Sequence, residues 1–94
     1  MIWITAVQFD ASGQDEHAHI RAVRWRDAES RQQGQSTVAE MIDLIRAQTL
    51  VYVSDDTFER TALVRVVDAK IPYLRSWAHG KWGNDLLALP RFEG

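Results

Sequence analysis

Residues 36–46, STVAEMIDLIR, are the best-specified element of this 94-residue chain. Thr37 precedes Glu40 by three residues, which is the spacing of a capping box, in which side chains and backbone N–H groups at the start of a helix bond reciprocally. Apolar side chains then recur with helical spacing at Val38, Met41, Ile42 and Ile45. Burying such side chains contributes roughly 1.5 to 3 kcal/mol each, so we expect a helix with one face packed on a sheet.

Two segments before this helix are rich in β-branched and aromatic side chains and are predicted to be strands, at residues 2–9 and 19–26. Residues 27–35, which follow them, form a polar connector. In the second strand, Ile20 and Ala22 alternate onto one face, whereas Val23 and Trp25 fall on the other. This pattern indicates a β-bulge or burial on both faces of the strand.

Further strands are predicted after the helix, at residues 50–54, 61–68 and 73–78. Pro72 can stand at the start of the last of these strands, because an edge or first position does not need its missing N–H. His79 and Gly80 resemble a two-residue hairpin turn, after which Lys81 and Trp82 return beside the strand. The order β-β-α-β-β-β predicts a single α+β domain over residues 1–94, with one helix packed across a mostly antiparallel sheet of about five strands.

Composition is that of a small globular domain without covalent cross-links. Hydrophobic residues make up 46% and charged residues 26% of the chain, and the absence of cysteine excludes disulfides and thiol-ligated metal sites. A formal net charge of −2 does not suit a protein whose whole surface attracts phosphate. The first residues, MIWITAVQFD, lack the basic region and long apolar run of a signal peptide or membrane span, so we expect a cytoplasmic protein that does not contact membranes.

The last quarter of the chain carries a recognisable pattern. Its residues are Tyr73-Leu74-Arg75-Ser76, a turn at Gly80, Asn84, Leu86-Leu87 and Leu89-Pro90. They resemble the signature YL(R/K)T, DG, DNLLxLP of a family of short bacterial and phage proteins catalogued only as a domain of unknown function, of the 3892 type. The sequence departs from it in three ways: Ser76 replaces threonine, His79 replaces aspartate, and Asn84-Asp85 reverses the usual order. The resemblance covers residues 72–90 specifically and most of the chain weakly, and it implies a fold without implying an activity.

The same closing stretch also has a sufficient structural explanation. Asn84 or Asp85 can cap a short turn over residues 86–89, and Pro90 ends that turn. The leucines of the turn can then close the bottom of the sheet as a hydrophobic lid. We therefore interpret residues 72–92 as a structural end of the fold, with a binding site as the alternative.

Residues able to support catalysis or metal binding are few. His17 and His19 stand on the same side of an extended segment, a spacing that can chelate a metal, but no second cluster supplies further ligands, so we interpret both as solvated histidines. The chain has neither a nucleophile elbow nor a glycine-rich phosphate loop. Its clustered carboxylates fall in predicted loops, including a turn at residues 55–57, and are Asp15, Glu16, Asp55, Asp56 and Glu59. We therefore predict no catalytic residue, metal or cofactor.

Arginine and tryptophan residues are the candidate binding residues. Cations and aromatic side chains interleave in two segments, which gives the predicted partner-binding set Arg24, Trp25, Arg26, Arg75, Trp77, Lys81 and Trp82. Such residues dominate protein interfaces and also form platforms for single-stranded nucleic acid. Among the tryptophans we expect Trp3 to be a core residue and Trp82 to be exposed.

These observations predict a non-enzymatic module that binds another protein, or a second copy of itself through a sheet edge. Nucleic-acid binding through the same cations is the alternative hypothesis. A small hydrolase or metal-assisted enzyme is a third, and it would require His17 and His19 to meet an acidic side chain in space.

Overall fold

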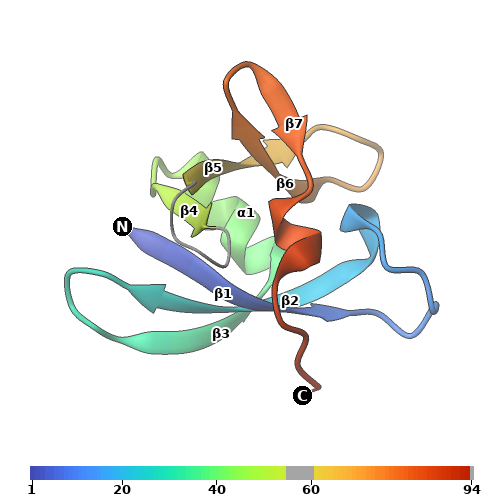
Figure 1. Ribbon diagram of the computed structural model, residues 1–94, viewed down its shortest axis with the longest axis horizontal. Helices are drawn as coiled ribbons and strands as arrows, with labels where there is room; N and C mark the ends of the chain where they lie inside the picture. The colour runs from blue at the N-terminus through green and yellow to red at the C-terminus, as the bar shows by residue number, and fades with distance from the viewer. Residues whose placement is uncertain (55–60, 94) are drawn as a thin grey trace.

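The strands of this chain pair into one continuous sheet (Figure 1). The computed structural model describes residues 1–54 and 61–93. Within these ranges, seven strands lie in the order β3-β2-β1-β4-β5-β6-β7. Their bounds are β1 Ile2–Phe9, β2 Ile20–Asp27, β3 Gln33–Thr37, β4 Val51–Ser54, β5 Thr61–Val67, β6 Tyr73–Ala78 and β7 Lys81–Gly83. The predicted turn at residues 55–57 and the carboxylate of Glu59 lie outside the described residues.

The sheet consists of two groups of strands that are consecutive in sequence. In the first group, β2 pairs antiparallel with β1 and with β3. In the second group, β4, β5, β6 and β7 each pair antiparallel with the next strand. The groups meet where β4 runs parallel to β1, with Ile2 opposite Val51 and Trp3 opposite Tyr52. The helix α1, Val38–Arg46, lies between the two groups (Figure 1). The predicted α+β class, with a mostly antiparallel sheet and one helix packed across it, is confirmed.

The helix α1 begins at the predicted capping box. The Thr37 hydroxyl accepts the Glu40 backbone N–H at 3.2 Å, and the Glu40 carboxylate accepts the Thr37 backbone N–H at 3.0 Å. After Arg46 the chain turns at Gln48, whose φ of 75° is in the left-handed region typical of helix ends. With nine residues, α1 is the longest helix of the described segments, and none of their helices has the length and apolar character needed to cross a membrane.

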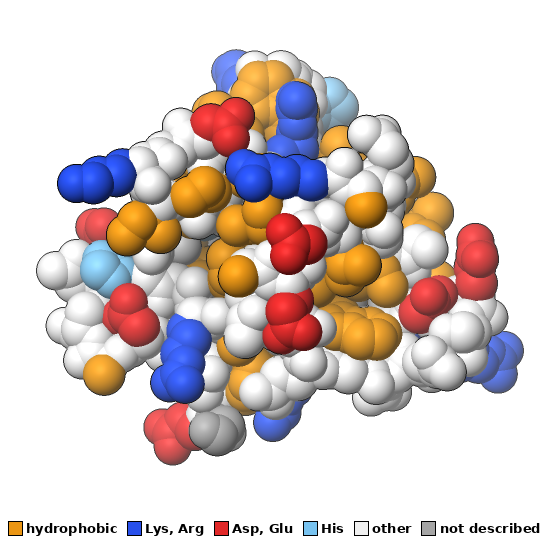
Figure 2. Space-filling model, turned by 180° about the vertical axis from the view of Figure 1, so that it is seen from behind, with side chains coloured by type: hydrophobic (Ala, Val, Ile, Leu, Met, Phe, Trp, Pro, Cys, Tyr) orange, Lys and Arg blue, Asp and Glu red, His pale blue; other side chains and the backbone are white. Residues whose placement is uncertain are grey.

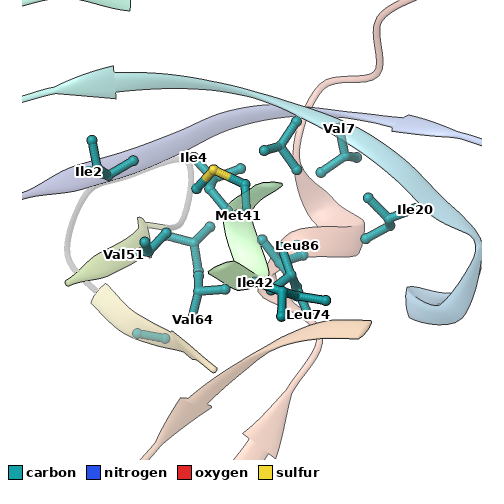
Figure 3. Close-up of a cluster of buried hydrophobic side chains, with 13 residues drawn as sticks. Ile2, Ile4, Val7, Ile20, Met41, Ile42, Val51, Val64, Leu74 and Leu86 are labelled. Carbon is teal, nitrogen blue, oxygen red and sulfur yellow. The ribbon is translucent and has the colours of Figure 1, made fainter. Parts of the chain in front are cut away.

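The core lies between α1 and the inner face of the curved sheet. Met41 is fully buried at its centre, surrounded by side chains of both strand groups (Figure 3). A short 3-10 helix near the C-terminus, η2, Asp85–Ala88, adds Leu86, which is also fully buried. The predicted leucine lid is therefore part of the main core, with Leu87 and Leu89 packed against it.

β-Bulges divide the buried residues of β1 and β2 between the two faces of the sheet. The register shifts between Ile4 and Ala6 and again between Gln8 and Phe9. Ile20 and Val23 consequently join the main core, whereas Ala22 packs on the other face in a small cluster with Ala6 and Phe92. The predicted bulge and two-sided burial are both present, but Ile20 and Ala22 lie on opposite faces rather than on one.

Two strands, β3 and β7, were not counted among the predicted strands, so the sheet has more strands than predicted. β3 lies inside the predicted polar connector and reads QGQST, without the β-branched alternation that signals a strand. It forms because it pairs in register with β2, from Gln33 opposite Arg26 to Thr37 opposite Ala22. β7 is the predicted return after the hairpin turn, where His79 and Gly80 have φ values of 54° and 76°. Two positive φ angles are typical of a type I′ hairpin turn.

Replacement of Thr37 by Ala should remove the hydroxyl that accepts the Glu40 N–H. We expect the free energy of unfolding to fall by about 0.5 to 2 kcal/mol, measured by urea denaturation. Thr37→Ser is the matched control, because it retains the hydroxyl and should keep most of the stability. Equal losses in the two variants would show that the cap does not stabilise α1.

Candidate functional site

A row of directly opposed residues crosses the sheet on the face that points away from α1. We call this the outer row, and it consists of Arg26, Trp3, Tyr52, Leu63, Trp77 and Trp82, each paired with the next on the neighbouring strand. Opposed residues of paired strands present their side chains on the same face. The face is the outer one because the residues next to them along the chain, such as Ile4, Val53 and Val64, are buried in the core.

The aromatic side chains of the outer row contact one another in pairs. Trp3 and Tyr52 have ring centroids 5.4 Å apart, and Trp77 and Trp82 meet edge to face at 4.8 Å. The guanidinium carbon of Arg65 lies 5.4 Å from the centroid of the Trp77 ring, which is a cation–π geometry. The row therefore combines aromatic surface with an arginine on a face that is in contact with solvent.

Trp82 is 41% exposed, which confirms that it is an exposed tryptophan. The prediction that Trp3 lies in the core is wrong, because Trp3 is only half-buried and its ring contacts the tilted ring of Tyr52 in the outer row. The alternation of β1 gives the inward positions to Ile2 and Ile4 instead.

Charge is unevenly distributed over the described strands. Every charged side chain at an outward-facing position of their paired residues is an arginine, namely Arg24, Arg26, Arg65 and Arg75. Carboxylates occur elsewhere, for example on the exposed side of α1 at Glu40 and Asp43. Over the side of the molecule seen in Figure 2, acidic, basic and apolar side chains are interspersed. A chain of net charge −2 therefore carries a positive outer sheet face.

Arg24 forms a cation–π contact with the C-terminal segment. Its guanidinium carbon lies 4.3 Å above the Phe92 ring. Phe92 is held in place by a hydrogen bond from its N–H to the carbonyl of Val7, 3.1 Å, and the preceding Arg91 bonds Asp15 at 2.7 Å. The C-terminal segment thus covers one end of the outer face of β1 and β2.

Trp25 faces away from the arginines and the other two tryptophans of the predicted partner-binding set. Its ring packs against the main core, and its Nε1 donates to the Ser36 hydroxyl at 3.0 Å. A Cβ on Gly34 would lie 2.5 Å from Trp25 Cζ2, so the ring requires glycine at that position of β3. Lys81 also lies off the outer row, since it is paired with Ala78 beside the hairpin turn.

Three of the predicted residues belong to the outer row: Trp77 and Trp82 are neighbours at one end, and Arg26 lies at the other end. Sequence reasoning missed its members Trp3, Tyr52 and Leu63 and the adjoining Arg65. These residues come from three different strands, and the register between strands that aligns them has no local sequence signal.

Arg75 has a structural function at the end of β6. Its Nε donates to the carbonyl of Gly83 at 3.0 Å and its Nη2 to the Asn84 side-chain oxygen at 3.1 Å. Asn84 stands at the N-terminal cap of η2, but its side chain makes no cap hydrogen bond there, contrary to one of the predicted options. Arg75 therefore fastens the closing segment to the sheet rather than projecting freely into solvent.

A hydrogen bond between Ser76 and Asp85 is the second contact that holds the closing segment against the sheet. The buried Ser76 hydroxyl donates to the Asp85 carboxylate at 2.7 Å. A Cβ on Gly83 would approach the Asp85 carboxylate to 2.8 Å and the Ser76 hydroxyl to 2.9 Å, so a side chain at this position would have to displace the hydrogen-bonded pair. These contacts support the structural interpretation of residues 72–92.

The two histidines at the start of β2 lie in different environments. They belong to a 3-10 helix, η1, His17–His19, rather than to an extended segment. His19 Nδ1 lies 2.9 Å from the Asp10 carboxylate, and hydrogen bonds from Ser12 and then from His19 lower the pKa of Asp10 to about 2. In the described residues, no group of three or more histidine or carboxylate side chains is arranged to hold a metal ion.

The prediction that His17 is solvated is wrong. Its side chain is buried, with the residue only 8% exposed, and its Nε2 has no hydrogen-bond partner among the described residues. Burial, followed by the positive charge of Arg75, lowers the pKa of His17. A neutral imidazole is therefore favoured in the folded chain.

Residues 3–90 match a family described as a protein of unknown function, DUF3892. The chain belongs to the DUF3892 family. This confirms the family that the closing residues resemble. Comparisons with curated proteins and with solved structures gave no match. The DUF3892 match extends over both strand groups and α1, so it includes the outer row as well as the closing segment.

The buried His17 should make stability depend on pH. Because its pKa is lower in the folded chain, the unfolded chain binds the proton more tightly, and the free energy of unfolding should decrease as the pH falls below about 6.5. Urea denaturation between about pH 5 and pH 8 should show a smaller decrease for His17→Leu than for the wild type.

His79→Asn is the matched control for this comparison, since His79 is exposed and asparagine tolerates its positive φ. It should retain the pH dependence of the wild type. If His17→Leu and the wild type lose stability in parallel, His17 is not the group responsible.

Proposed function

We propose that this chain is a non-enzymatic binding module that binds another protein through the outer row. The observation that supports this proposal is the row itself, in which Trp3, Tyr52, Trp77 and Trp82 lie in register on one solvent-facing side of the sheet. Tryptophan, tyrosine and arginine are the residues that contribute most to protein interfaces. The end of the row with Trp77, Trp82 and the neighbouring Arg65 is the richest in such residues.

The contacts within the row favour a protein partner over nucleic acid. Platforms for single strands offer free ring faces on which bases stack. Here the Trp77 ring is contacted by the Arg65 guanidinium and, edge to face, by Trp82, and the Trp3 ring is contacted by Tyr52. The faces of these rings are therefore partly occupied. Protein surfaces can instead contact the exposed edges and half-buried faces of such clusters.

Nucleic-acid binding remains a second candidate because of one specific observation. The outward-facing charges of the described strands are all arginines, and arginine contacts phosphate by charge and by paired hydrogen bonds. Arg24 and Arg26 lie two residues apart on β2 and would be the first phosphate contacts to examine.

We also propose a cytoplasmic location in a bacterial cell, or in one infected by a phage that encodes the protein. The resemblance of the closing residues to those of short bacterial and phage proteins supports the source. The lack of cysteine in a chain of this size is compatible with a reducing compartment, because small secreted domains commonly depend on disulfides.

The double variant Arg65→Ala/Trp82→Ala should lose capture of the protein partner. Both residues are exposed, so the fold should be retained, which circular dichroism can check. If they are interface hot spots, capture from a lysate of the source organism should fall at least about 10-fold in quantitative mass spectrometry. Glu29→Ala/Lys70→Ala, at exposed positions off the outer row, is the control and should capture the partner as the wild type does. Undiminished capture by the first variant would exclude this end of the row as the interface.

Labelled single- and double-stranded oligonucleotides provide the test between the two candidates. If the partner is a protein, fluorescence anisotropy at low salt should show binding weaker than about 10⁻⁴ M, the weak end of non-specific nucleic-acid affinity. Tighter binding that falls steeply with added salt, and that Arg24→Ala/Arg26→Ala weakens, would replace the protein-binding proposal by the nucleic-acid one.

A further inference from the structure

The strand β3 is an edge strand without the usual protection against pairing. Natural edge strands are commonly shortened, bulged, or provided with charged residues or proline. The other edge of the described sheet, β7, has only three residues and includes Lys81. β3 has five residues, QGQST, with neither charge nor proline, and it pairs with β2 in unbroken register.

The hydrogen-bond pattern shows which backbone groups of β3 point outward. Asp27 donates its N–H to the carbonyl of Gln32 at 2.8 Å, so the groups of Asp27 face β3. Because antiparallel pairs alternate, the groups of Gly34 and Ser36 are directed toward β2, and those of Gln33 and Gln35 toward the open edge. Both glutamines are exposed.

The next outward-facing residue of β3 is Thr37, and its backbone N–H already has a hydrogen-bond acceptor. Thr37 donates its N–H to the Glu40 carboxylate in the capping box of α1. The free edge therefore consists of two donors and two acceptors, all on Gln33 and Gln35. A strand that pairs here must therefore offer backbone donors and acceptors opposite Gln33 and Gln35, which are two positions apart.

We propose that β3 pairs antiparallel with β3 of a second copy of this chain, about a two-fold axis through Gly34. In this register Gln33 of each copy lies opposite Gln35 of the other, and each such pair exchanges two backbone hydrogen bonds. A register centred on Gln35 would place Gln33 opposite Thr37, whose N–H is occupied by Glu40. The capping box thus selects the register centred on Gly34.

Side chains at both ends of β3 suit this arrangement. Arg31 lies in the turn just before β3, with its N–H bonded to the Asp27 carbonyl, and this pairing brings that end of β3 near the Thr37 end of the other copy, where Thr37 binds the Glu40 carboxylate. Arg31 and Glu40 are both exposed, so the two-fold axis brings two pairs of opposite charges together. The uncharged side chains of Gln33 and Gln35 lie opposite each other on the outer face, where amides can hydrogen-bond across strands.

This pairing would join two seven-stranded sheets edge to edge and place two outer rows on one surface. The contact is short, so we expect a reversible dimer with a dissociation constant of about 10⁻⁵ to 10⁻³ M. The proposal concerns the edge of the sheet and does not depend on what the outer row binds.

Analytical ultracentrifugation of the full chain from about 10 µM to 1 mM tests the proposal over the range in which such a dimer forms. The wild type should shift from monomer to dimer. Gln33→Lys/Gln35→Lys places lysines opposite each other across the axis, and should raise the dissociation constant at least about 10-fold. Gln14→Lys/Ala88→Lys adds the same charge at exposed positions away from β3 and should dimerise as the wild type does.

Amide hydrogen exchange of the wild type gives a second readout that needs no variant. Raising the protein concentration should slow exchange of the Gln33 and Gln35 N–H groups, because they become hydrogen-bonded in the dimer. A chain that stays monomeric up to 1 mM would overturn the proposal. So would dimerisation unchanged by the lysine pair, or concentration-dependent protection at β7 in place of β3.

Discussion

The structure depends on one constraint, the need to cover the apolar face of α1. The helix is short and presents Met41 and Ile42 on one side, and both are buried. The sheet satisfies this constraint by curving, so that strands on both sides of α1 contribute to one core. Once the inner face of each central strand is occupied in this way, the alternate residues must face outward, which is how Trp3, Tyr52 and Trp77 come to share a surface.

The elements that sequence reasoning predicted well are those with local signals. The capping box and helical spacing specify α1, and the consecutive β-branched and aromatic residues specify β1. A two-residue turn at His79 and Gly80 specifies the last hairpin. β3 has no such signal, because its polar sequence becomes a strand only through pairing with β2.

The candidate site was only partly predictable for a related reason. Residue type indicated that tryptophan and arginine form the surface, but the face that each residue occupies depends on strand phase and bulges. Trp25 turns inward because it pairs opposite Ile4, and Trp3 turns outward as the neighbour of Ile4 on β1. Arg75 is drawn into contacts with Gly83 and Asn84, and His17 is buried beside β6, because segments distant in sequence meet there.

The short parallel contact between β1 and β4 has a consequence for how the chain folds. Strand pairing within each of the two groups involves chain neighbours, so it can form by closing short loops. The contacts of Ile2 with Val51 and of Trp3 with Tyr52 instead require residues from distant parts of the chain to meet. Contacts of that kind close large loops and slow folding, so we expect β4 to dock beside β1 late.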